Sequence, residues 1–150
     1  MNNLSITKVL ENDIDTKSSF KGVFASDTCP RTLQRGRCYV INTDPVAFPG
    51  RHWVCLYVPQ GKGSVEYFDS YGRPPTTVPG IANVLRNRNV IHNTKQIQSL
   101  YSDVCGHYCI YFLKQRCVGR SMHSIVNKFT DDPRRNDKYV ERLIRPLFVK

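Results

Sequence analysis

The chain has 150 residues, of which 40% are hydrophobic and 23% charged, a balance typical of a globular domain. A chain of this length buries roughly two-thirds of its unfolded surface, so we expect one domain over residues 1–150 that folds without disulfides. No apolar run reaches membrane-spanning length, and the N-terminus lacks the layout of a signal peptide. We therefore expect a protein that is neither inserted in a membrane nor secreted.

The formal net charge is +10, and the excess is largest in residues 111–150, which carry ten Lys or Arg against four Asp or Glu. Such an excess attracts anionic partners such as nucleic acid in a salt-sensitive way, although a basic surface also serves simply to keep a protein soluble. The six cysteines are Cys29, Cys38, Cys55, Cys105, Cys109 and Cys117. In the cytosol or nucleus we expect them to stay reduced and mostly buried.

The first third of the chain predicts a helix, a loop and a strand. Residues 4–11 carry spaced apolar side chains and predict a short helix capped by Asn3 or Ser5. Residues 20–30 mix aromatic residues with Gly and Pro, which favours a structured loop. Residues 38–42 are β-branched and aromatic, as in a buried strand.

A β-hairpin is predicted next, with strands over residues 52–58 and 64–69 joined by a Gly-rich turn. Antiparallel pairing brings His52, at the start of one strand, near Asp69, at the end of the other. Because strand side chains alternate between faces, Glu66 falls on the face opposite to Asp69. Asp69 is therefore the stronger candidate for a histidine partner.

The second half of the chain is mainly helical. A short helix carries residues 81–85, and residues 89–97 are expected to form a strand. Apolar residues at helical spacing predict one helix after Ser121, which caps it, and another after Asp137. Pro146 limits the last helix.

The segment of residues 98–117 reads QSLYSDVCGHYCIYFLKQRC and places Cys105 in the first turn of an amphipathic helix. Free N–H groups and the helix dipole stabilise a thiolate at that position. Gly106 lacks a side chain, so a substrate backbone can approach the sulfur closely. The alternative is that Cys105 is only a small core residue.

A cysteine nucleophile needs a base, a group that orients the base, and donors for the oxyanion. His52 can act as the base and Asp69 can fix its tautomer. The Gln98 side-chain amide and the Cys105 backbone N–H can hold the oxyanion. The chain thus contains one candidate for each catalytic role.

These residues lie in a set of short motifs. The motifs are Gly50-x-His52-Trp53, Phe68-Asp69-x-Tyr71-Gly72, Gln98 seven positions before Cys105, and Cys105-Gly106-x-x-Cys109. From about Gly22 to the C-terminus, the chain resembles the adenain family of adenovirus maturation proteases. It resembles more distantly the SUMO-specific proteases of the same cysteine-peptidase clan.

The resemblance implies an α+β, papain-like fold in permuted order, with a central mixed sheet flanked by helices and the nucleophile at a helix N-terminus. It also implies a thiol endopeptidase that cuts after glycine in a narrow groove. Trp53 matches the wall of that groove, Gly50 a point of close approach to substrate, and Asp27 an upstream substrate-facing loop. The alternative for Trp53 is a core aromatic residue.

The small size and basic charge look most like proteases of adenovirus-like and polinton-type DNA viruses. The resemblance then implies a monomer in the virion and in the host nucleus or cytoplasm, processing capsid or core precursors at Gly-rich sites. Its chemistry needs no cofactor, but relatives of the adenovirus kind are activated by DNA and by a disulfide-linked viral peptide. The linking cysteine would fall near Asn87, and no cysteine lies between Cys55 and Cys105. DNA binding through the basic C-terminal region is therefore the activation that fits this chain.

Three alternatives stay open on the sequence. A SUMO or ubiquitin-like deconjugating protease would use the same four catalytic residues. A non-enzymatic DNA-binding protein would explain the charge but not the ordered His, Asp, Gln and Cys. A zinc site from Cys105, His107 and Cys109 is disfavoured because His107 leaves the shared helical face of the two cysteines, so we expect no metal.

Overall fold

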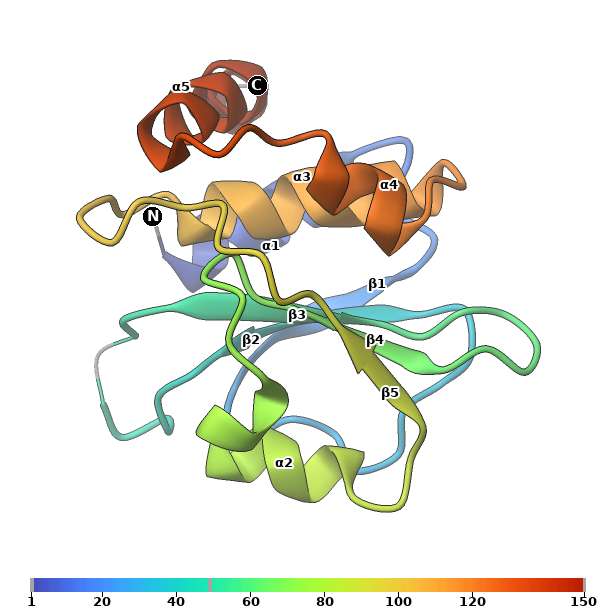
Figure 1. Ribbon diagram of the computed structural model, residues 1–150. Helices are drawn as coiled ribbons and strands as arrows, with labels where there is room; N and C mark the ends of the chain where they lie inside the picture. Colours follow the sequence, from blue (N-terminus) through green and yellow to red (C-terminus); the bar gives the residue numbers. More distant parts are fainter. Residues whose placement is uncertain (1, 49, 150) are drawn as a thin grey trace.

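The computed structural model describes residues 2–48 and 50–149, in which five strands form one mixed sheet between two layers of helices (Figure 1). The strands are β1 Phe20–Ala25, β2 Cys38–Asn42, β3 Trp53–Tyr57, β4 Val65–Phe68 and β5 Val90–His92, and they lie side by side in that order. β3 runs antiparallel to β2 and β4, whereas β1 pairs parallel with β2 and β5 parallel with β4.

The helices divide unequally between the two faces of the sheet. They are α1 Asn3–Asn12, α2 Pro79–Leu85, α3 Cys105–Cys117, α4 Met122–Asn127 and α5 Pro133–Ile144, with short 3-10 helices η1 Pro75–Thr77 and η2 Arg145–Val149. α2 covers one face, and α1, α3, α4 and α5 lie over the other (Figure 1). Of the described helices, none is long and apolar enough to cross a membrane.

The alternation of side chains along each strand creates two hydrophobic cores. Cys55 and Phe68 point into the larger core beneath α3, where the Phe68 and Phe112 rings stack with centroids 4.4 Å apart. Leu56 points to the opposite face and packs in a smaller core with Ile81 of α2. The helices are therefore held by the two faces of one sheet.

The predicted hairpin and the strand before it are confirmed. β2 covers exactly the residues expected, β3 and β4 pair antiparallel, and Cys55 lies opposite Phe68. Ser121 caps α4 by accepting a hydrogen bond from the Ser124 N–H at 3.1 Å. The cysteine-containing helix begins at Cys105, as the apolar spacing predicted.

Residues 20–30 were expected to form a loop, and that expectation is wrong for their first half. Residues Phe20–Ala25 form the edge strand β1, whose pairing with β2 is irregular between Phe20 and Gly22. An edge strand is only half buried, so its sequence carries little alternation, and parallel pairing depends on residues far along the chain.

The bounds of three further elements also differ from the prediction. α1 is capped by Asn2, whose side chain accepts from the Ser5 N–H at 2.9 Å. The strand expected over 89–97 ends at His92, because the chain then leaves the sheet. α5 begins at Pro133 rather than after Asp137, since Asp132 caps its first N–H groups and Pro suits the first helical position.

Candidate active site

The candidate catalytic residues gather at one edge of the sheet. β1, β2, β4 and β5 all end there and β3 begins there, which follows from their directions. His52 directly precedes β3 and Asp69 directly follows β4. The His52 Nε2 and Asp69 Oδ1 atoms lie 2.7 Å apart, so the predicted pair forms.

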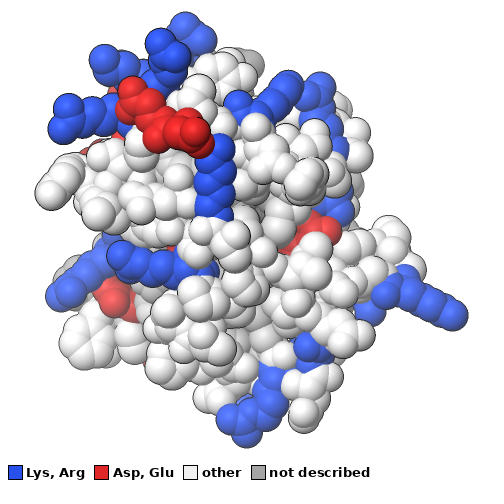
Figure 2. Space-filling view, viewed as in Figure 1, with Lys and Arg blue, Asp and Glu red and all other residues white. Residues whose placement is uncertain are grey.

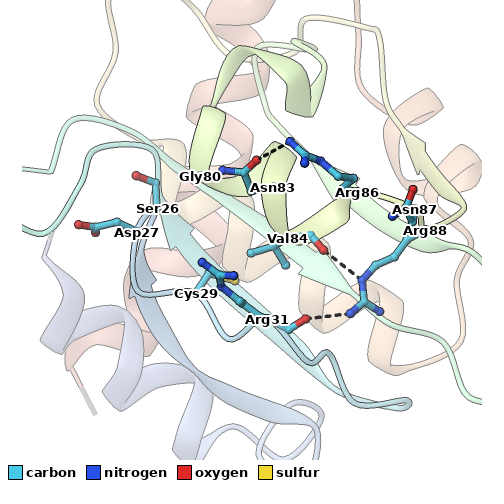
Figure 3. A pocket seen from close by; sticks show the side chains of 10 residues that line it. All are labelled: Ser26, Asp27, Cys29, Arg31, Gly80, Asn83, Val84, Arg86, Asn87 and Arg88. Carbon is cyan, nitrogen blue, oxygen red and sulfur yellow. Dashed lines mark hydrogen bonds between the residues drawn. The ribbon is translucent and has the colours of Figure 1, made fainter.

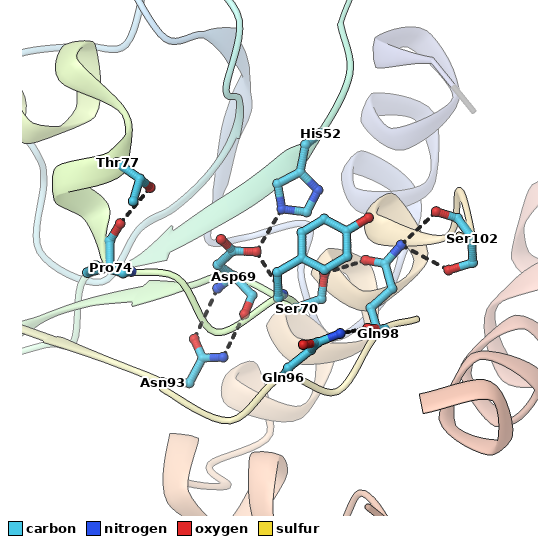
Figure 4. A network of polar contacts seen from close by, with 10 residues as sticks. His52, Asp69, Ser70, Pro74, Thr77, Asn93, Gln96, Gln98 and Ser102 are labelled. Atoms are coloured by element: carbon cyan, nitrogen blue, oxygen red, sulfur yellow. Dashed lines mark hydrogen bonds and ion pairs between the residues drawn. The ribbon is translucent and has the colours of Figure 1, made fainter. Parts of the chain in front are cut away.

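Asp69 is held on its side chain and on its backbone (Figure 4). Its Oδ1 also accepts a hydrogen bond from the Tyr71 N–H at 2.9 Å. The buried Asn93 side chain accepts from the Asp69 N–H at 3.0 Å and donates to the Asp69 carbonyl at 2.6 Å. These bonds fix the carboxylate before any substrate arrives.

His52 lies between Asp69 and the ring of Tyr71, whose centroid is 4.5 Å from that of the imidazole in a stacked arrangement. Burial lowers the pKa of His52, but interactions with the side chains of Asp69 and Cys105 outweigh it and raise that pKa to about 9. Nδ1 is buried and makes no hydrogen bond within the described part of the chain. Because Nε2 is engaged by Asp69, Nδ1 is the imidazole nitrogen left without a partner.

Cys105 is the first residue of α3 and is 4% exposed. Val104 precedes it as the cap residue and offers no side-chain acceptor to the N–H groups of the first turn. Those groups, including the N–H of Cys105, therefore remain available to an anion. The next residue, Gly106, is also buried and adds no side chain beside the sulfur.

Gln98 is fully buried and links the acid-bearing segment to the turn before the cysteine (Figure 4). Its Oε1 accepts from the Ser70 hydroxyl at 2.5 Å. Its Nε2 donates to the Ser102 carbonyl at 3.2 Å and to the Ser102 hydroxyl at 3.1 Å. Gln98 thus bonds the residue that follows Asp69 in the chain, and its amide protons are directed to Ser102.

The predicted substrate-binding residues occupy different settings. Gly50 is exposed, and a Cβ there would lie 2.0 Å from Asn42 Nδ2. Asp27 follows β1 at the same sheet edge and accepts from the Val46 N–H at 2.8 Å. Trp53 lies in the core beneath α3, and its indole N–H donates to Asn3 Oδ1 at 3.0 Å. Trp53 therefore packs as a core aromatic residue, and its place in a substrate groove stays a prediction.

Glu66, the other carboxylate of β4, faces away from His52, as alternation predicted. It is buried and forms a two-point ion pair with Arg116 of α3, with both N–O distances at 2.8 Å. Glu66 therefore contributes to holding α3 on the sheet.

Three residues that sequence reasoning did not assign also shape the site. Ser70 lies inside the matched Phe-Asp-x-Tyr-Gly block, which was a signal that could have been followed. Asn93 and Ser102 stand outside every motif, and nothing in the sequence marked them. Within the described residues, no group of three His, Cys, Asp or Glu side chains is placed to hold a metal ion.

Comparisons with known proteins find a viral enzyme that is similar in sequence. No protein-family model matches the chain. In sequence, it is 29% identical over 105 residues to the cysteine protease S273R of African swine fever virus, covering 62% of this chain and 38% of that protein. The chain therefore spans well under half the length of that relative by sequence.

Solved structures share the fold. The crystal structure of the African swine fever virus pS273R protease matches with a TM-score of 0.59 at 19% identity, over 94% of this chain and 65% of that chain. The central domain of an uncharacterized protein, Lpg1148 of Legionella pneumophila, matches with a TM-score of 0.57 at 13% identity, over 100% of this chain and 98% of that chain. The chain is thus similar in sequence to a viral cysteine protease and shares with it a mixed α+β fold that fits the papain-like expectation.

Proposed function

We propose that this chain is a cysteine endopeptidase with Cys105 as nucleophile, His52 as base and Asp69 as the residue that orients His52. The observation that carries the proposal is the His52–Asp69 pair at 2.7 Å, which leaves the buried Nδ1 of His52 without a partner among the described residues. Similarity to a viral cysteine protease supports cysteine peptidase activity.

In this mechanism the Cys105 proton moves to His52 Nδ1, and the thiolate attacks the carbonyl carbon of the scissile peptide. The carbonyl oxygen becomes an oxyanion that accepts from the Cys105 backbone N–H and from the Gln98 amide. Gln98 donates to Ser102 in the free protein, so one of these bonds is exchanged for the oxyanion. His52 then protonates the leaving amine, and water hydrolyses the thioester to release the carboxylate product and restore the thiol.

The finer part of the proposal is cleavage after glycine in viral precursor proteins during virion maturation, as in the adenain family. Support comes from the motifs around Gly50, His52 and Cys105, and from Gly106 beside the sulfur, which leaves room for a substrate backbone. Stimulation by DNA is proposed on the charge of residues 111–150. The proposed enzyme acts as a monomer in the virion and in the infected cell.

The test compares two substrates, a fluorogenic peptide with glycines before the cleaved bond and a ubiquitin-like C-terminal fusion, each with and without DNA. We expect the wild-type protein to cleave the peptide and the Cys105→Ala variant to be inactive but folded by circular dichroism. Activity retained in Cys105→Ala would refute the nucleophile assignment. Cleavage confined to the folded modifier would assign the enzyme to the deconjugating proteases.

A further inference from the structure

A cavity of about 870 Å³ lies on the α2 face, between the loop that follows β1 and the C-terminal end of α2 (Figure 3). Three arginines, Arg31, Arg86 and Arg88, line it together with Asn83 and Asn87. None of these residues belongs to the proposed catalytic set.

The arginines of this cavity have no carboxylate partner within the part of the chain that the structure describes. Arg88 donates to the carbonyls of Val84 and Arg31 at 3.1 Å and 2.9 Å, and Arg86 donates to Asn83 Oδ1 at 3.0 Å (Figure 3). Each guanidinium carries five N–H donors, so most of the donors remain free.

The acidic lining residue is Asp27, and its carboxylate accepts a hydrogen bond from the Val46 N–H at 2.8 Å. It forms no ion pair with the lining arginines. The cavity therefore keeps an uncompensated positive charge.

A second cavity of about 250 Å³ lies next to the first and shares the lining residues Asn87 and Arg88 with it. It adds Arg35 and Lys62, so five basic residues follow the two cavities. In Figure 2, the lower part of the molecule, where Figure 1 places α2, shows basic side chains and no acidic ones. We call the two cavities together the cationic groove.

The groove is built on closely packed backbone. Gly80 of α2 lies against the loop after β1, where a Cβ would be 2.2 Å from the Ser26 carbonyl oxygen. Asn87 adopts a left-handed conformation with φ of 65° in the turn from α2 to β5. The backbone that carries the groove is thus closely packed, whereas the arginine side chains that line it are exposed.

We infer that the cationic groove binds an acidic peptide segment of the protein substrate, an inference that rests on the proposed endopeptidase function. Arginine forks match carboxylates in two-point geometry, and the larger cavity falls within the roughly 300–1,000 Å³ of ordinary ligand clefts. The groove begins at Ser26 and Asp27, at the same sheet edge as His52. A chain held there therefore reaches the end of the sheet at which His52 lies.

A peptide fits the groove better than a nucleic acid does. Single-stranded nucleic acids gain much of their affinity by stacking bases on aromatic side chains. No aromatic residue is among those that line either cavity in the described part of the chain. The groove thus supplies charge and hydrogen bonds without a stacking surface.

The test measures binding to the Cys105→Ala variant, so that cleavage does not interfere. The probe is a fluorescein-labelled octapeptide of alternating Asp and Glu, and its control is the matching Asn and Gln octapeptide. The double variant Arg31→Gln/Arg86→Gln alters the groove, and Arg134→Gln/Arg135→Gln removes the same charge from α5. We expect anisotropy titrations to show about tenfold weaker binding for the groove variant and less than about twofold change for the α5 variant.

Equal binding by the two double variants, or equal binding of the uncharged octapeptide, would overturn the inference. Tighter binding of a 12-nucleotide single strand than of the acidic octapeptide, lost in the groove variant, would assign the groove to nucleic acid instead. In the active enzyme, a Gly-containing substrate extended by the acidic segment should show a higher KM and an unchanged kcat in the groove variant. Binding without any cleavage by the wild-type protein would contradict the proposed function and leave the groove assignment intact.

Discussion

The two carboxylates of the β4 segment allow a matched test of the site, because Asp69→Asn and Glu66→Gln remove the same charge three residues apart. Asp69 is 2% exposed and bonds His52 at 2.7 Å. The rise of the His52 pKa from 6.5 to about 9 corresponds to roughly 3 kcal/mol of extra stabilisation of the imidazolium, much of it supplied by Asp69. The loss of this stabilisation in Asp69→Asn is expected to lower kcat/KM by about a hundredfold.

Glu66→Gln is expected to act on stability instead. The Glu66 and Arg116 side chains are 7% and 14% exposed, and removing one charge of such a buried pair costs about 3 kcal/mol. The site lies outside this ion pair, so the folded variant should keep nearly normal kcat/KM.

Both variants would be assayed with the fluorogenic peptide over a range of pH and by urea denaturation. Asp69 favours the imidazolium, so Asp69→Asn should also move the alkaline limb of the kcat/KM profile to lower pH. If Glu66→Gln lost more activity per mole of folded protein than Asp69→Asn, the assignment of Asp69 as the orienting carboxylate would be wrong.

Three further outcomes are expected. Because folding raises the His52 pKa, His52 should contribute up to about 3 kcal/mol to the free energy of unfolding below pH 6.5, and this contribution should fade as pH rises through about 9. The urea midpoints of wild type and Asp69→Asn should therefore converge at alkaline pH. A difference between the two midpoints that stays constant with pH would contradict this. Ser70→Ala removes the 2.5 Å bond from Ser70 to Gln98 and should lower kcat about tenfold with little change in KM, whereas an unchanged kcat would show that Ser70 does not position Gln98 for catalysis. Stimulation of peptide cleavage by DNA should fall steeply between 50 and roughly 200 mM salt, and a flat response would indicate that the basic C-terminal region only aids solubility.

Local patterns in the sequence determined the centre of the site. Two-residue alternation and a Gly-rich turn set the hairpin, which places His52 and Asp69 on the same face at one end of the sheet and sends Glu66 to the other face. The apolar spacing after Cys105 likewise fixed where α3 begins. These features could be predicted because each depends on residues close together in the chain.

Non-local packing decided the rest. β1 forms only because β2 offers it a parallel partner, and Asn93 supports Asp69 from a segment 24 residues away. Alternation could place Trp53 on the face of the sheet that α3 covers. Only the docking of α1 enclosed Trp53 in the core and brought Asn3 to accept a hydrogen bond from its indole N–H.

The cationic groove shows the same limit most clearly. Arg31 and Arg88 are separated by 57 residues, and their spacing in the sequence carries no sign that they share a cavity. Periodicity reports which side of an element is buried, whereas the position of one element against another depends on the packing of the whole sheet and its helices. The sequence therefore predicted the His52–Asp69 pair, and the tertiary structure alone decided what surrounds it.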